Sequence, residues 1–191
     1  MTFIEVTPTD TVKYEIDKVS GYLKVDRPQK FSNIVPALYG FIPRSYCDDH
    51  DPLDICVLTE RHISHGNILV PARPIGGFRM IDGGEADDKI IAVLKGDEAY
   101  DTWRDISDVP ASIIERLKHY FMTYKQIPTE GEESKCEIDQ IYGVEEAIKV
   151  IESSQADYKV HYGGLELGMS KTALEAIKYG LETTASEKEQ P

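Results

Sequence analysis

Asp49-His50-Asp51-Pro52-Leu53-Asp54 leads directly into Ile55-Cys56-Val57-Leu58. The apolar stretch predicts a buried strand, and the run before it crowds three carboxylates at the mouth of that strand. Neighbouring carboxylates repel one another, so such a cluster favours a bound cation. Hard cations such as Mg²⁺ or Ca²⁺ prefer oxygen ligands of this kind. A solvated acidic turn is the alternative, and this run alone leaves both interpretations open.

Length and charge narrow the function classes. A chain of 191 residues can form one domain with a sizeable core. Its net charge of -13 argues against a nucleic-acid partner or an acidic membrane, since both require a basic surface. An anionic small substrate would need metal ions or a local cluster of Lys and Arg. Three cysteines, no signal-peptide pattern and no apolar run of membrane-spanning length favour a cytoplasmic protein.

The pattern of apolar residues predicts short strands followed by helices. Residues 27–46 hold three prolines and one glycine and are expected to be irregular. Helical spacing follows over residues 110–125, after Gly143, and over 171–179, with a frayed end beyond. Strands are expected at 12–17, 22–25, 54–59, 68–70, 77–80, 89–94 and 136–141.

A second acidic group runs from Asp82 to Lys89 around a Gly-Gly turn. That turn can bring Asp82 and Asp87 toward one another, and Lys89 shares the side of the strand on which Asp87 lies. An EF-hand loop starting at Asp49 is excluded, because its sixth position requires Gly and that position is Asp54 here. A zinc site would need the fold to join two pairs, Cys47 with His50 and His62 with His65, and solvated histidines are the commoner outcome.

Taken in order, these motifs resemble those of the soluble family I inorganic pyrophosphatases of bacterial type. The acidic run fits the family signature Asp-x-Asp-Pro-apolar-Asp at every defined position. The resemblance extends from Phe3 to Tyr158. Its other marks are Lys13-Tyr14-Glu15, Val25-Asp26-Arg27, Tyr39-Gly40, the stretch from Asp82 to Lys89, and Tyr124-Lys125.

The resemblance implies Mg²⁺-dependent hydrolysis of pyrophosphate to two phosphates by a metal-activated water, with no covalent intermediate. Mn²⁺ or another divalent ion is a possible substitute. Asp49, Asp54 and Asp87 resemble the ligands of the first Mg²⁺, and Asp54 is shared with a second ion. Three further carboxylates resemble the ligands, direct or through water, of the ions that arrive with substrate. They are Asp82, Glu15 and Glu5.

The resemblance also implies catalytic and substrate-binding residues. Asp51 resembles the general base. Tyr39 resembles the tyrosine beside the nucleophile and substrate, and Lys89 the lysine that orders the carboxylates and phosphate. Four residues resemble the groups that hold the phosphates in the family. They are Lys13, Arg27, Tyr124 and Lys125. Val35 and Leu38 depart from residues common in bacterial members, which puts hydrogen bonds at the rim of the pocket and the metal preference in question.

The fold class is α+β, mainly β. Composition and periodicity support only a mixed domain with short strands, and the resemblance implies a small five-stranded closed barrel, similar to an OB barrel, flanked by two or three helices. One domain is expected over residues 1–162, with a C-terminal extension over 163–191. The resemblance also implies a homo-oligomer, either a hexamer or a dimer, because closed symmetry is the usual outcome.

Two rival functions stay open at this point. A hydrolase of nucleoside polyphosphates would use similar metals but would need a wall that binds a base or a sugar. A non-catalytic divalent-ion or OB-type binding module would have no use for the phosphate-holding side chains.

Overall fold

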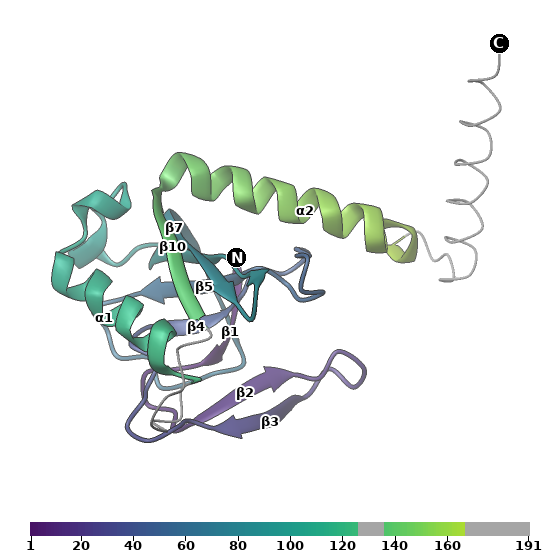
Figure 1. Ribbon diagram of the computed structural model, residues 1–191, viewed down its shortest axis with the longest axis horizontal. Coiled ribbons are helices and arrows are strands. Elements are labelled where there is room, and N and C mark those ends of the chain that lie inside the picture. The colour runs from purple at the N-terminus through teal and green to yellow at the C-terminus, as the bar shows by residue number, and fades with distance from the viewer. Residues whose placement is uncertain (126–135, 167–191) are drawn as a thin grey trace, which may run out of the picture.

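The computed structural model describes residues 1–125 and 136–166 (Figure 1). Its helices are α1 (Ala111–Thr123) and α2 (Val144–Glu166), with two short 3₁₀ helices at Glu98–Tyr100 and Ile106–Asp108. Its strands are β1 (Thr2–Val6), β2 (Val12–Ile16), β3 (Leu23–Pro28), β4 (Leu38–Phe41), β5 (Asp54–Leu58), β6 (Ile68–Val70), β7 (Ala72–Asp82), β8 (Glu85–Ala86), β9 (Lys89–Leu94) and β10 (Cys136–Gly143).

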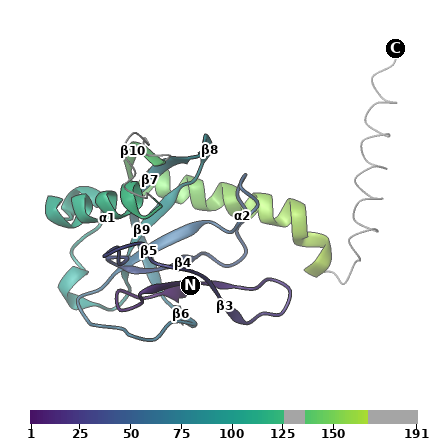
Figure 2. The same ribbon diagram turned by 60° about the horizontal axis from the view of Figure 1, so that its bottom comes forward.

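Most of the strands form one sheet, which runs in the order β10-β7-β9-β5-β4-β1-β6, with β8 paired to β7. All pairs are antiparallel except β5 with β9, which run parallel. The hairpin of β2 and β3 is a separate two-stranded sheet that lies beside the main one (Figure 1), and Figure 2 shows its strand β3 in a turned view. The pairings of the described residues are an open path from β10 to β6, so the closed barrel stays a prediction.

The central strands β5 and β9 separate two hydrophobic cores. Successive side chains of a strand point to opposite faces. Accordingly Cys56 and Ile91 pack in one cluster with α1, whereas Ile55 and Ile90 pack in the other with Ala147 of α2. The sheet therefore has a helix on each face, and its middle strands read as continuous apolar runs.

The structure corrects the expectation of little regular structure in residues 27–46, because β4 lies inside this segment and pairs with both β1 and β5. Gly40 permits this arrangement, since a Cβ there would lie 1.9 Å from the carbonyl oxygen of Phe3. Strand β1 was also absent from the predicted strands, and β7 is longer than the predicted residues 77–80. A register shift between Pro74 and Gly76 is the bulge that such residues favour.

Both predicted helices within the described residues are confirmed. Helix α1 begins directly after Pro110, and α2 follows Gly143 without a connecting loop. Helix α2 runs along the sheet and extends past it (Figure 1). The helix continues without a break through residue 162, where the predicted domain ends. The helix expected over residues 171–179 lies outside the described residues. Within the described ranges, no helix combines the length and the hydropathy of a membrane span.

Candidate active site

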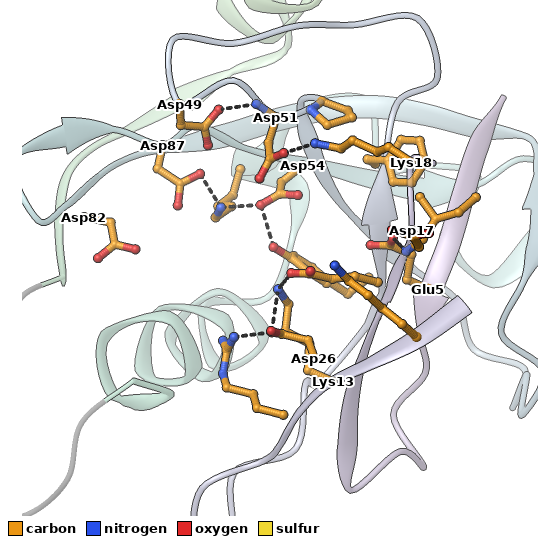
Figure 3. A pocket seen from close by; sticks show the side chains of 18 of the residues that line it. Glu5, Lys13, Asp17, Lys18, Asp26, Asp49, Asp51, Asp54, Asp82 and Asp87 are labelled. Carbon is orange, nitrogen blue, oxygen red and sulfur yellow. Dashed lines mark hydrogen bonds and ion pairs between the residues drawn. The ribbon is translucent and has the colours of Figure 1, made fainter. Parts of the chain in front are cut away.

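A cavity of about 500 Å³ opens between the β2–β3 hairpin and the main sheet (Figure 3). Nine carboxylates and six cationic side chains line it. The lining includes every residue that the sequence predicted for the site, namely Glu5, Lys13, Glu15, Arg27, Tyr39, Asp49, Asp51, Asp54, Asp82, Asp87, Lys89, Tyr124 and Lys125. The fold therefore gathers into one cavity side chains that are up to 120 positions apart in the sequence.

The floor of the cavity holds a buried cation between two carboxylates. Asp54 and Lys89 are register partners at the start of the parallel strands β5 and β9, which sets their side chains next to each other. The Lys89 side chain is only 2% exposed, and its ammonium forms ion pairs with both Asp54 and Asp87, the two carboxylates labelled in Figure 3. Burial alone would lower the pKa of Lys89, but the two carboxylates outweigh it and raise that pKa, so Lys89 carries its charge.

Tyr39 completes the floor from β4. Its hydroxyl donates a hydrogen bond to Asp54 Oδ2 at 2.5 Å, and its ring packs against that of Phe121 in α1. Burial, reinforced by the charge of Asp54, raises the pKa of Tyr39 well above its usual value. The phenol is therefore a neutral donor that fixes one oxygen of Asp54.

The acidic run forms a tight loop on one wall of the cavity. The backbone N–H of Asp51 donates to Asp49 Oδ1 at 3.0 Å, and the Asp51 carboxylate pairs with Lys18 from the turn of the hairpin (Figure 3). Burial raises the pKa of Asp49, and the charges of Asp51 and Asp54 add to this effect. Like charges thus lie close together on this wall without full compensation.

The opposite wall comes from the β2–β3 hairpin. Lys13 and Arg27 are register partners across the hairpin, so their side chains reach the cavity together. Asp26 joins them, because its carboxylate lies 3.3 Å from the Lys13 ammonium and also pairs with Arg27. Lys13 pairs in addition with Glu15 on the same strand. This wall offers two cations, one a planar guanidinium suited to bidentate contact with an oxyanion.

A further cation, Lys125, comes from the residues just after α1. Lys125 pairs with Asp82 at the end of β7, and although burial opposes it, this contact lowers the pKa of Asp82. The Cys136 thiol also donates to Asp82 at 3.4 Å. Tyr124 is buried, and two cations lie near its ring, with the Arg27 guanidinium 5.9 Å and the Lys125 ammonium 5.3 Å from the ring centroid.

Glu5 reaches the cavity from β1 and is 8% exposed. Its Oε1 accepts the backbone N–H of Ile16 at 2.7 Å, which ties β1 to the hairpin. Burial raises the pKa of Glu5 to about 7, and the charges of Asp54 and Glu15 act in the same direction. The charged form of Glu5 is therefore disfavoured in this cavity unless a cation lies nearby.

The carboxylates fit a hard divalent cation in their chemistry, because they are oxygen donors and burial and mutual repulsion raise the pKa of Asp49 and of Asp87. As the side chains stand, no three His, Cys, Asp or Glu in residues 1–125 and 136–166 are grouped to hold a metal ion. Lys89 neutralises part of the charge between Asp54 and Asp87. A cation here would relieve the remaining repulsion.

The alternative zinc site is not formed in the part of the chain that the structure describes. The side chain of His50 bonds to Tyr46, whereas His62 lines a different, smaller cavity with Arg61 and Tyr100.

Two functional-looking side chains were not predicted from the sequence. Lys18 was expected only as a turn residue, yet it pairs with Asp51. Asp26 was noted only as part of a motif, yet it holds both Lys13 and Arg27. Strand alternation alone would place Asp26 on the face opposite Arg27. The pairing shifts register between Lys13 and Tyr14, which leaves Asp26 as the extra residue of β3, and local sequence does not show such a bulge. Nothing in the local sequence around Lys18 indicates a partner 33 residues away.

The family model, the relatives found by sequence and the solved structures that resemble this chain agree with one another. The sequence model of a family described as inorganic pyrophosphatase matches residues 2–159. An inorganic pyrophosphatase from Chlamydia caviae is 54% identical, over 82% of this chain and 82% of its own length. One from Chlamydia muridarum is 51% identical, over 82% of this chain and 85% of its own. The crystal structure of inorganic pyrophosphatase from Thermus thermophilus superposes with a TM-score of 0.77 at 31% identity, covering 83% of this chain and 90% of that chain.

Proposed function

Because the chain belongs to the inorganic pyrophosphatase family, we propose that it hydrolyses inorganic pyrophosphate to two phosphates with Mg²⁺ as the cofactor. The observation that carries the proposal is the cavity of about 500 Å³ that both carboxylates and cationic side chains line. Carboxylates alone would repel a compact polyanion, and cations alone would not hold divalent metal ions. A substrate that arrives with Mg²⁺ uses both sets.

We propose that Asp49, Asp54 and Asp87 hold the first Mg²⁺, with Asp54 shared with a second ion. Asp82, Glu15 and Glu5 would serve the ions that accompany the substrate, directly or through water. When bound, Mg²⁺ would offset the charge of pyrophosphate and lower the pKa of a nearby water, and Mn²⁺ is a possible substitute. Tyr39 and Lys89 both contact Oδ2 of Asp54, and these two contacts would fix the orientation of its carboxylate for this task.

Four side chains would bind the phosphates. Arg27 makes bidentate contact, whereas Lys13 and Lys125 act as point charges, and Tyr124 supplies a hydroxyl. In the described structure Lys13, Arg27 and Lys125 are paired with carboxylates. Phosphate oxygens would compete for these cations, so substrate binding exchanges one set of ion pairs for another.

Asp51 is proposed as the general base. Asp51 is exposed and lines the cavity, and it would take the proton from the attacking water. The water oxygen then bonds to one phosphorus while the bond from that phosphorus to the bridging oxygen breaks, and the second phosphate leaves with the bonding electrons. No covalent bond to the protein forms in this sequence.

The test is phosphate release from pyrophosphate with Mg²⁺, compared with release from a nucleoside triphosphate. Asp51→Asn should lower kcat by about 10²- to 10⁴-fold, the usual contribution of a general base, while the circular dichroism spectrum is unchanged. Asp48→Asn is the matched control, because Asp48 is exposed in the same loop and does not line the cavity. Turnover of the triphosphate alone would support a nucleoside polyphosphate hydrolase, and metal binding without turnover a binding module.

The proposal also covers the barrel, the cellular location and the oligomeric state. We propose that β1, β4, β5, β7 and β9 belong to a five-stranded OB-like barrel, supported by their consecutive places in one sheet. We also propose a cytoplasmic location and a homo-oligomer, either a hexamer or a dimer. Size-exclusion chromatography with light scattering tests the last of these.

A further inference from the structure

The backbone of the acidic loop adopts a conformation that its central residue disfavours. His50, between Asp49 and Asp51, has a φ of 66°, in the left-handed region. A side chain with a Cβ rarely occupies this region, although His does so more often than most residues. The loop is closed by two backbone hydrogen bonds, from Cys47 N–H to the carbonyl of Asp51 at 2.9 Å and from His50 N–H to the carbonyl of Cys47 at 3.0 Å.

This turn sets the relation of the two carboxylates. In an extended chain Asp49 and Asp51 would project side by side. Here the carboxylate of Asp49 instead folds back and accepts the N–H of Asp51 at 3.0 Å, an Asx turn. The orientation of one carboxylate is thus tied to the backbone of the other, and both depend on the conformation of His50.

Tyr46 holds the His50 ring. The Tyr46 hydroxyl and His50 Nδ1 share a hydrogen bond of 2.8 Å. Tyr46 is itself anchored on α2, because its N–H donates to the carbonyl of Ser154 at 2.9 Å and its ring lies against two aromatic rings of the helix. The ring centroids are 4.4 Å from His161 and 5.5 Å from Tyr162. The far half of α2 therefore backs the acidic loop from outside the cavity.

We infer that Tyr46 and His50, braced by the end of α2 at His161 and Tyr162, are positioning residues that hold Asp49 and Asp51 in the geometry for metal binding and proton abstraction. The inference rests on the proposed function. Neither Tyr46 nor His50 lines the cavity, so they act through the loop. An ordered loop pays the entropic cost of orienting two carboxylates during folding and not at each binding event.

Tyr46→Phe tests the brace, since it keeps the ring against α2 and removes the hydroxyl. The full chain should bind Mn²⁺ about threefold to tenfold more weakly without substrate, the range expected for one hydrogen bond, with kcat lowered by at least as much. Mn²⁺ affinity is measured by electron paramagnetic resonance, and Tm by calorimetry. Tyr22→Phe is the matched control, because Tyr22 is 78% exposed in the hairpin and does not line the cavity.

A second pair of variants isolates the backbone. His50→Gly and His50→Ala both remove the ring, but only Gly adopts a positive φ without cost. The Ala variant should therefore bind Mn²⁺ about fivefold more weakly than the Gly variant. Equal affinities of these two variants would show that the left-handed turn does not orient the ligands and would overturn that part of the inference.

A purely structural role predicts a different pattern, in which Tyr46→Phe lowers Tm but leaves both the Mn²⁺ affinity and kcat at the wild-type values. That result would overturn the inference. If wild-type protein binds Mn²⁺ yet does not cleave pyrophosphate, the proposed function fails, but the affinity measurements still decide whether the brace orients Asp49. The two failures are therefore distinguishable.

Discussion

Lys89 forms ion pairs with two carboxylates on the cavity floor. Its side chain is 2% exposed, and it neutralises Asp54 and Asp87, which are 26% and 17% exposed. Lys89→Met keeps most of the volume but leaves two nearly buried carboxylates facing each other. We expect the free energy of unfolding to fall by about 3 kcal/mol without divalent ions, as for other broken buried ion pairs. Urea unfolding in EDTA measures this.

Lys18 provides the matched comparison, because it also pairs with an aspartate of the acidic loop but its side chain is 58% exposed. Lys18→Met should cost less than about 1 kcal/mol, the usual worth of a surface pair. Mg²⁺ should restore part of the stability lost in Lys89→Met, since a bound cation can replace the ammonium. Equal losses in the two variants would mean that the buried pair is worth no more than the exposed one.

At the scale of elements, α2 depends on a cap supplied from outside its own sequence. Asp105, at the start of a 3₁₀ helix, accepts the N–H of Val144 at 2.8 Å and that of Ser107 at 3.0 Å. These hydrogen bonds to the charged form lower the pKa of Asp105. Asp105→Ala should cost about 1 kcal/mol at pH 7, as for other lost N-caps.

The pH dependence of this cap follows from the direction of the shift. The pKa of Asp105 is lower in the folded than in the unfolded chain, so acid protonates the unfolded chain first. The stabilisation is therefore complete above the unfolded value near ~3.9 and is lost as the pH falls through the folded value. The urea midpoints of wild type and Asp105→Ala should therefore differ by a constant amount from pH 7 down to about pH 4 and draw together as the pH falls further. A gap that stays constant below about pH 4 as well would exclude the charge as the origin of the cap.

The elements show what periodicity can predict. The strand at β9 and the helix at α1 were predictable because long apolar patterns specify them locally. Strand β4 was not, since Leu38–Phe41 is short, lies among prolines and gains its identity from partners on both sides. Strand pairing of this kind depends on residues distant in sequence, which local propensity does not contain.

For the whole molecule, the candidate site was more predictable than the sheet around it. Its residues form short motifs whose chemistry is visible in order along the chain, and they do line one cavity. Lys18 and the Tyr46–His161 contact were not predictable, because each joins segments that only the tertiary fold brings together. The motifs thus predicted which side chains gather in one cavity, whereas the contacts behind them require the structure.

The chain as a whole carries a net charge of -13, and nine carboxylates face six cations in the cavity. Divalent ions that bind only the folded state should therefore stabilise the molecule. Mg²⁺ at ~100 times its dissociation constant should add about 2.7 kcal/mol, which for a chain of this size raises Tm by about 5–10 °C. Scanning calorimetry in Mg²⁺ is compared with scanning calorimetry in NaCl of equal ionic strength, because monovalent salt only screens the general repulsion.

Two variants locate the effect in the cavity. Asp49→Asn should lose most of the Mg²⁺-specific rise in Tm, whereas Asp48→Asn should keep it. An equal rise in NaCl, or an undiminished rise in Asp49→Asn, would mean that the ions act on the overall charge of the molecule and not at the cavity.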